Sequence, residues 1–380
     1  MQRNIALLIL LLGVTVTTWL RSDRVLIVPD DTLHFTALKL PPAAKLAAHL
    51  GPFRLMGAWH MTLGSYKFGG YSALVALPDK RLLAVADNGR FLTFMPPGGR
   101  PYTPVLGTLL TDKRNDKRMV DTESATRDPS TGTIWLGLEY LNAIVRIGPH
   151  WQETGRVRPK AMADWPPNSG PESLLRLSDG RFITLSEGAQ EWIYPRRHDG
   201  VLFAGDPVAA QGKGQRFTFD GPAAFDPVDM AQLPDGRVLI LMRTLIWPLP
   251  EKFAGRIAIG DPAQIREGGT WKVTEVARIA SGLPIDNFEG MAVVPRADGM
   301  VTVWLISDDN QTRLQRTLLW KLVVDPSQLP GASQQHPREK ARGSLRAPVP
   351  NRCPPLSAAR RPGPAAAGCR RAPAPRARPS

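Results

Sequence analysis

The sequence predicts an all-β protein, a β-propeller of six blades preceded by a short apolar N-terminal helix. Five segments share one hairpin pattern at intervals of about 50 to 60 residues, the range of propeller blades. Turn-forming Asp-Gly or Pro-Asp pairs separate strands rich in β-forming residues, and long helical patterns are absent from this part of the chain. A β-sandwich is the structural alternative, but it would not require a common start residue in each unit.

The first segment, residues 1–24, has the pattern of a signal peptide or membrane anchor. A positive start at Arg3 precedes the 16-residue apolar run 5–20, which is short for a membrane span and suits the apolar region of a signal peptide. No cleavage site with small residues is evident. We expect a periplasmic or secreted protein, with an uncleaved inner-membrane anchor and a buried first helix as alternatives. Membrane contact is expected through this segment alone.

Residues 25–50 form a lead-in segment, and the propeller is predicted over residues 51–330. Within the lead-in segment, the stretch 43–50 is compatible with a helix. The five turns are predicted at 78–80, 128–132, 178–180, 234–236 and 297–299. The second strands that follow them are predicted at 82–86, 133–138, 182–185, 238–242 and 301–306. The sixth blade is expected to combine residues 51–63 with a hairpin in residues 256–279.

The last segment, residues 331–380, carries most of the chain's net charge of +14. It holds eleven basic residues, one acid (Glu339) and both cysteines, Cys353 and Cys369, in a Pro/Ala/Arg-rich context that predicts disorder. It is interpreted either as a basic arm for anionic lipid or polymer or as a tail without function. The remaining 37 basic and 33 acidic residues nearly cancel, so nucleic acid is not an expected partner, and we expect a monomer.

Acidic residues recur at both ends of the predicted hairpins. Four stand where a first strand begins and four where a second strand ends. The first group is Glu123, Glu172, Asp229 and Glu289, and the second is Asp87, Glu139, Glu187 and Asp308, with Asp309 beside it. In an antiparallel hairpin these two positions lie at the same end of the sheet. We therefore expect the acids to surround one mouth of a central channel.

Carboxylates brought this close repel one another unless they are protonated, paired with cations or bound to metal. Oxygen ligands of this kind suit Ca²⁺, and all of these acids except Asp308 are predicted primarily as its ligands. Asp308 is predicted as a catalytic residue, either ligand or base. The alternative role for such acids is structural, accepting backbone N–H groups from the next blade.

Arg243 places a cation where the other units have an acid. Pairing with Asp229, its predicted neighbour in the hairpin, is one interpretation. The other is a catalytic role in which its guanidinium binds a phosphate or carboxylate group of the substrate. The sequence has no Gly-x-Ser-x-Gly elbow, Walker loop, dinucleotide-binding turn or His-Glu-x-x-His motif.

Five motifs carry a resemblance to a known family. They are Phe68-Gly69-Gly70-Tyr71-Ser72-Ala73-Leu74, Asp121-Thr122-Glu123-Ser124, Asn168-Ser169-Gly170-Pro171-Glu172-Ser173, Asp286-Asn287-Phe288-Glu289-Gly290-Met291 and Ser307-Asp308-Asp309-Asn310. In this order they resemble the phytase-like family, labelled "esterase-like activity of phytase". The resemblance implies an exported bacterial propeller and Ca²⁺-dependent hydrolysis of a small phosphoester or ester. A metal-stabilised propeller without catalysis that binds a ligand or envelope partner, and a gluconolactonase-like lactone hydrolase, are the alternative functions.

Overall fold

The computed structural model describes residues 30–112, 116–190, 196–248, 251–312 and 314–331. These all belong to one unit, which ends at Gln334. The predicted signal or anchor segment lies outside the described residues, and of the C-terminal segment only Gly331 lies inside them. The one α-helix of the described part, α2 (Ala43–Leu50), occupies the stretch expected to tolerate helix. No helix in this part of the chain is long and apolar enough to cross a membrane.

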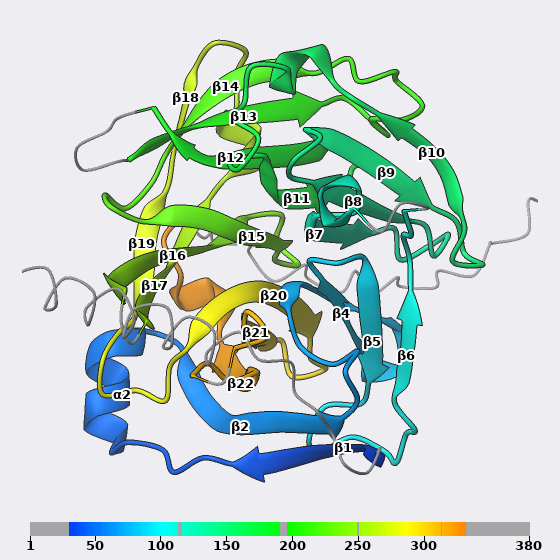
Figure 1. Ribbon diagram of the computed structural model, residues 1–380. Helices are drawn as coiled ribbons and strands as arrows, with labels where there is room; N and C mark the ends of the chain where they lie inside the picture. Colours follow the sequence, from blue (N-terminus) through cyan, green and yellow to red (C-terminus); the bar gives the residue numbers. More distant parts are fainter. Residues whose placement is uncertain (1–29, 113–115, 191–195, 249–250, 313, 332–380) are drawn as a thin grey trace, which may run out of the picture. The chain divides into compact units, whose positions relative to one another are not determined.

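The strands form five sheets, which follow one another in the chain as the blades of a propeller (Figure 1). Blade 1 contains β3 (Tyr71–Ala76), β4 (Leu82–Ala86), β5 (Arg90–Phe94) and β6 (Val105–Thr108). Blade 2 contains β7 (Thr122–Arg127), β8 (Ile134–Leu138), β9 (Ala143–Ile147) and β10 (Glu153–Val157). Blade 3 contains β11 (Pro171–Arg176), β12 (Phe182–Ala189), β13 (Arg197–Phe203), β14 (Gln215–Asp220) and β18 (Thr270–Lys272).

Blade 4 contains β15 (Asp226–Gln232), β16 (Val238–Pro248), β17 (Glu251–Gly260) and β19 (Thr274–Ile279). Blade 5 contains β20 (Asn287–Pro295), β21 (Val301–Asp308), β22 (Leu318–Val324), β2 (Arg54–Gly64) and β1 (Asp30–Ala37). The first strand of each hairpin is the inner strand of its blade. The inner strands β3, β7, β11, β15 and β20 contact one another in this order, and β20 contacts β3 to close the ring.

The expected sixth blade is absent from the described residues, because both of its predicted parts join other blades. Strand β2 pairs with β22, with Leu55 opposite Leu322, so an early segment completes the last blade. Figure 1 shows this pairing as a blue strand beside an orange one. Strands β17 and β19 complete blade 4, and β18 pairs in parallel with β14 of blade 3. Each of these strands covers a sheet edge that would otherwise expose unpaired backbone groups.

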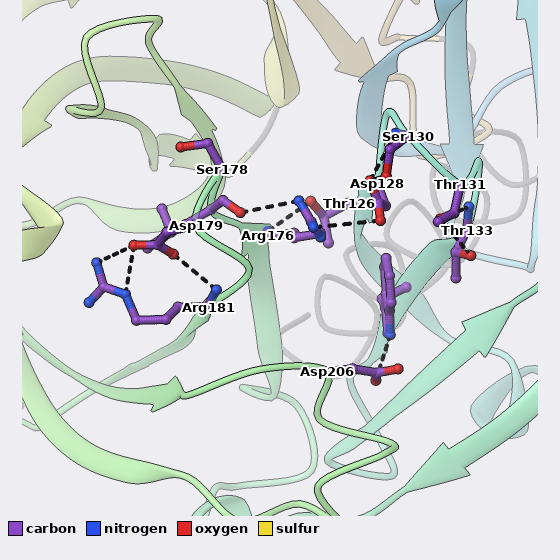
Figure 2. A network of polar contacts seen from close by, with 12 residues as sticks. Thr126, Asp128, Ser130, Thr131, Thr133, Arg176, Ser178, Asp179, Arg181 and Asp206 are labelled. Carbon is purple, nitrogen blue, oxygen red and sulfur yellow. Dashed lines mark hydrogen bonds and ion pairs between the residues drawn. The ribbon is translucent and has the colours of Figure 1, made fainter. Parts of the chain in front are cut away.

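The turns between first and second strands lie at the ends of the hairpins, as predicted. Gly180 and Gly236 have φ angles of 91° and 94°, which glycine adopts without strain. Figure 2 shows the contacts that join blades 2 and 3 at this end of the hairpins. The backbone N–H of Arg176 donates to Oγ1 of Thr126 at 2.9 Å, and the Arg176 guanidinium lies 3.5 Å from Asp128.

Apolar side chains fill the space between neighbouring blades. Trp271 and Trp320 are fully buried, and Trp135 and Trp304 are each 5% exposed. These four tryptophans therefore contribute to the packing of the blades. Trp151 is different, because 39% of its surface is exposed.

Candidate metal centre

Each inner strand contains one extra residue relative to its partner, and the five extra residues occupy equivalent positions. The pairing of β11 with β12 passes from Pro171 opposite Ser186 to Ser173 opposite Leu185, which leaves Glu172 without a partner. The same shift isolates Ser72, Glu123, Val228 and Glu289 in the other blades. A β-bulge of this kind redirects the side chain of the extra residue. Three of the five bulges therefore present a glutamate.

Five equivalent positions also recur in or directly after the second strands, one residue beyond the partner of the residue that precedes each bulge, and four of them hold an acid. The residues are Asp87, Glu139, Glu187, Arg243 and Asp308. The register pairs Asp308 with Asn287 and Arg243 with Asp226. The backbone N–H of Glu139 donates to the carbonyl of Asp121 at 2.9 Å. The hairpin argument therefore places these residues at the same end of the blades as the bulges.

Side chains from different blades meet at this end. Carboxylate oxygens of Asp121, Glu123 and Glu139 lie within 4.8 Å of one another, and so do those of Glu139, Glu172 and Glu187. Glu139 of blade 2 thus belongs to both groups and connects them. We call the following nine residues the acidic cluster: Asp87, Asp121, Glu123, Glu139, Glu172, Glu187, Asp226, Glu289 and Asp308.

Two cations lie among these acids. Nη2 of Arg243 is 3.2 Å from Glu187 and its Nε is 3.1 Å from Glu289, so Arg243 bridges blades 3 and 5. Nζ of Lys117 is 2.7 Å from Asp87 and 3.3 Å from Asp121. Two cations leave most of the negative charge of nine carboxylates uncompensated.

The pKa values of the cluster reflect this imbalance. Burial, followed by the charge of Glu289, raises the pKa of Glu123 well above its ordinary value. Burial and then Glu187 have the same effect on the pKa of Glu172. Burial and the neighbouring Asp121 raise the pKa of Glu139 to about 7. In the absence of a further cation, the protonated forms of these groups are therefore favoured more strongly than in an exposed carboxyl group.

Two predicted metal ligands do not join the cluster. Asp229 is 1% exposed and accepts backbone N–H groups from Met230 at 2.8 Å and from Met291, in blade 5, at 2.6 Å. Asp309 accepts the N–H of Gly70 at 3.1 Å and the hydroxyl of Thr317 at 3.0 Å. These two acids hold neighbouring segments together, which is the structural role considered as the alternative.

The position of Asp229 also corrects the expected pairing of Arg243. The bulge at Val228 shifts the register, so that Asp229 lies opposite Leu241 and Asp226 lies opposite Arg243. Asp229 of blade 4 is therefore equivalent to Ser173 of blade 3, and not to Glu172, the bulge residue of that blade. A one-residue shift along a strand changes the face to which a side chain points.

Sequence reasoning missed three residues of this site, namely Asp121, Asp226 and Lys117. Asp121 and Asp226 precede their bulges by two residues, and this spacing could have identified them. Asn287 has the same spacing from Glu289, and its Nδ2 donates to Oε1 of Glu289 at 2.6 Å. Lys117 lies in the short 3₁₀ helix Lys117–Met119 before β7, where no sequence pattern marks it.

The residues present fit a divalent cation that binds oxygen. Asn287 is 2% exposed, and its Oδ1 accepts no hydrogen bond from the described residues. Oδ1 of Asp87 is likewise buried without a hydrogen-bond donor in this part of the chain. Buried acceptors without donors are costly, and a bound cation would satisfy them. Carboxylate and amide oxygens are the ligands that Ca²⁺ and Mg²⁺ prefer.

The fold and the site define a β-propeller with an acidic cluster at one end of its blades. The chain belongs to the phytase-like family, "esterase-like activity of phytase", whose model matches residues 66–311. This confirms the resemblance found in the sequence motifs. None of the curated proteins compared matches the chain.

Several solved structures are similar to the chain at low identity. Hydrazine synthase from Kuenenia stuttgartiensis is 11% identical with a TM-score of 0.37, over 63% of this chain and 77% of that one. The gluconolactonase XC5397 from Xanthomonas campestris is 15% identical with a TM-score of 0.36, over 78% and 96%. A chain of the nidogen/laminin complex is 11% identical with a TM-score of 0.39, over 76% and 97%.

Proposed function

We propose that this protein is an exported hydrolase of small phosphoesters or carboxylic esters that depends on a divalent cation, with Ca²⁺ as the first candidate. The observation that carries the proposal is the acidic cluster, which draws carboxylates from all five blades. Among the residues that the structure describes, Arg243 and Lys117 are the cations paired with it. Membership of the phytase-like family supports the reaction class. The apolar run at residues 5–20 supports export.

The cation would be held by glutamates of the bulges together with acids from the ends of the second strands. Glu139, Glu172 and Glu187 already have oxygens within 4.8 Å of one another, and Asn287 and Asp87 offer oxygens without donors. A bound cation would polarise a phosphoryl or carbonyl oxygen and lower the pKa of a water molecule. It would also lower the pKa values that burial and mutual repulsion now raise.

Arg243 is suited to bind the negatively charged oxygen of the substrate. Its Nε is buried and forms no hydrogen bond with the described residues, although Oε1 of Glu289 lies 3.1 Å away, because the two groups are misaligned. Its guanidinium therefore has an N–H group that can donate a hydrogen bond to a substrate oxygen. A fork-shaped guanidinium matches the oxygens of phosphate or carboxylate. Glu187 and Glu289 fix its position in the absence of substrate.

Proton transfer would fall to a carboxyl group of the acidic cluster. Asp308 is suited to this role, because burial and then the charge of Glu289 raise its pKa well above the ordinary value in the metal-free protein.

The test is hydrolysis of p-nitrophenyl phosphate, phytate and a short acyl ester, measured with added Ca²⁺ and with a chelator. We expect turnover that the chelator abolishes and that Glu289→Gln or Arg243→Gln reduces by about 100-fold or more. Asp298→Asn, at an exposed turn at the far end of blade 5, is the matched control and should retain full activity. Activity that survives both the chelator and Glu289→Gln contradicts the proposal.

The same experiment separates the alternatives. A propeller in which the ion is only structural would lose thermal stability with the chelator and turn over none of the substrates. A lactone hydrolase would open a sugar lactone in the presence of the cation and leave the esters intact. Fractionation of cells that express the full chain tests export, because a protein found in the cytoplasm contradicts it.

A further inference from the structure

A cavity of about 440 Å³ lies between blades 1 and 2, at the end of the blades opposite to the acidic cluster. Pro78 of the β3–β4 turn and Gly132 of the β7–β8 turn contribute to its wall. Strand β7 shows the separation of the two sites, since Glu123 near its start belongs to the acidic cluster and Arg127 at its end lines the cavity. A cavity of this volume can hold a small organic molecule.

Two stacked aromatic rings form one side of the cavity. The rings of Phe91, on β5, and Trp151, in the turn between β9 and β10, are parallel within 4° and their centroids are 4.5 Å apart. Phe91 lies opposite Gly107, where an added Cβ would be 2.4 Å from the Phe91 ring. The absence of a side chain at Gly107 therefore lets the Phe91 ring lie across β6.

Trp151 is an unusual residue for its position. Its φ angle is 64°, a left-handed conformation that costs a bulky residue about 1–2 kcal/mol relative to glycine. It is also 39% exposed, although tryptophan is usually well buried. An exposed aromatic ring at the edge of a cavity offers a flat apolar surface to a ligand.

Arg127 supplies a positive charge to the same cavity, and the neighbouring Asp128 balances that charge only in part, without a close ion pair. Within the described ranges, no carboxylate lies at ion-pairing distance from it and it forms no hydrogen bond. Arg176, the equivalent last residue of β11, instead lies 3.5 Å from Asp128 and donates to the carbonyl of Leu177 (Figure 2 shows the contact with Asp128). Partial burial lowers the pKa of Arg127, because water solvates its charge incompletely.

Tyr102 forms a polar part of the cavity wall together with Arg81 and Thr93. Its hydroxyl is 3.0 Å from both Nη1 of Arg81 and Oγ1 of Thr93, and its ring packs 5.0 Å from the Arg81 guanidinium. Asp79, 2.9 Å from Nε of Arg81, balances the charge of that arginine. The cavity wall is thus ordered before any ligand binds, and Arg127 remains as its unpaired charge.

We propose that this cavity binds a small aromatic anion, with its ring against Trp151 and its carboxylate, sulfonate or phosphate group on Arg127. The stacked rings select a planar apolar body, and the guanidinium selects two oxygens of an anionic group. The site does not depend on the proposed hydrolase activity, because it shares no residue with the acidic cluster.

Calorimetric titration of the full chain with naphthalene-2-sulfonate tests the proposal. We expect saturable binding that Arg127→Gln and Trp151→Gly each weaken by about tenfold or more. Arg176→Gln removes an arginine from the equivalent position of blade 3 and should leave the affinity within about twofold. The uncharged naphthalene-2-methanol should bind about tenfold more weakly than the sulfonate.

Three results would overturn the proposal. One is the absence of binding of naphthalene-2-sulfonate, phenyl phosphate and phenylacetate to the unmodified protein. Another is an unchanged affinity in Arg127→Gln, whose fold is checked by circular dichroism. The third is an equal loss in Arg176→Gln, which would show that the anion responds to net charge rather than to this cavity.

Discussion

Arg243 of blade 4 lies with its Nε 3.1 Å from Oε1 of Glu289 in blade 5. The same guanidinium is 3.2 Å from Glu187 of blade 3, so one cation connects three consecutive blades at the end that carries the acidic cluster. Its partners are partly or wholly withdrawn from water. The contribution of Arg243 to stability therefore depends on the negative charges that surround it.

Replacing Arg243 by Gln should destabilise the metal-free protein by about 2–3 kcal/mol, because Glu187 and Glu289 lose their cation. The free energy of unfolding from urea titration measures this loss. In a double-mutant cycle, Glu289→Gln should restore part of the stability, since it removes one of the unpaired charges. Additive effects of the two substitutions would show that Arg243 and Glu289 do not interact.

Ca²⁺ should stabilise the folded protein. A ligand that binds only the folded state at about 100 times its dissociation constant adds about 2.7 kcal/mol. Thermal unfolding followed by calorimetry, with Ca²⁺ and with chelator, measures the shift. Glu172→Gln should reduce the shift, and Asp298→Asn should leave it unchanged. A melting temperature that is insensitive to Ca²⁺ in all three proteins contradicts a cation site in the cluster.

The metal-free protein should lose stability as the pH rises. The pKa of Glu139 is raised from 4.5 to about 7 in the folded state, and that of Asp226 from 3.8 to about 6. The folded state therefore binds these protons more tightly than the unfolded state does. Their contribution to stability is complete below the unfolded pKa values and is lost as the pH rises through the folded ones.

Urea titrations of the chelated protein between about pH 4 and pH 8 measure this dependence. Glu139→Gln should flatten the slope near neutral pH, because glutamine does not titrate. Saturating Ca²⁺ should flatten it too, since the cation replaces the protons. A free energy of unfolding that rises across this pH range would show that these acids are ionised in the folded state and that other positive charges balance them.

Asp229→Asn should destabilise the protein without weakening the cation site. The carboxylate accepts N–H groups from Met230 and Met291, and the amide of Leu74 in blade 1 also donates to it. An asparagine would turn an N–H₂ group towards a backbone donor, at a cost of about 2–3 kcal/mol. Calorimetric titration with Ca²⁺ should return an unchanged affinity at a temperature where the variant is folded. A large loss of Ca²⁺ affinity would show that Asp229 is a ligand of the cation.

Much of the acidic end could be predicted from sequence, because it depends on local hairpin geometry. The turns at Gly180 and Gly236 set the length of each hairpin, and a hairpin of known length relates the start of its first strand to the end of its second. Glu139, Glu187 and Arg243 were aligned correctly for this reason. Asp229 was misaligned because the bulge at Val228 leaves no signature in residue type.

The amino-acid sequence alone determined the repeated hairpins, their turns and the recurrence of acids at one end of them. It also determined the family to which the protein belongs. These features follow from the twofold alternation of strands and from turn chemistry, which act over a few residues. The tertiary structure decided that there are five blades in the described part and that β2 completes the last one. It also decided that Asp128 forms its ion pair with Arg176 of the neighbouring blade and not with the adjacent Arg127. Contacts between residues far apart in the chain settle such questions, and no short stretch of sequence encodes them.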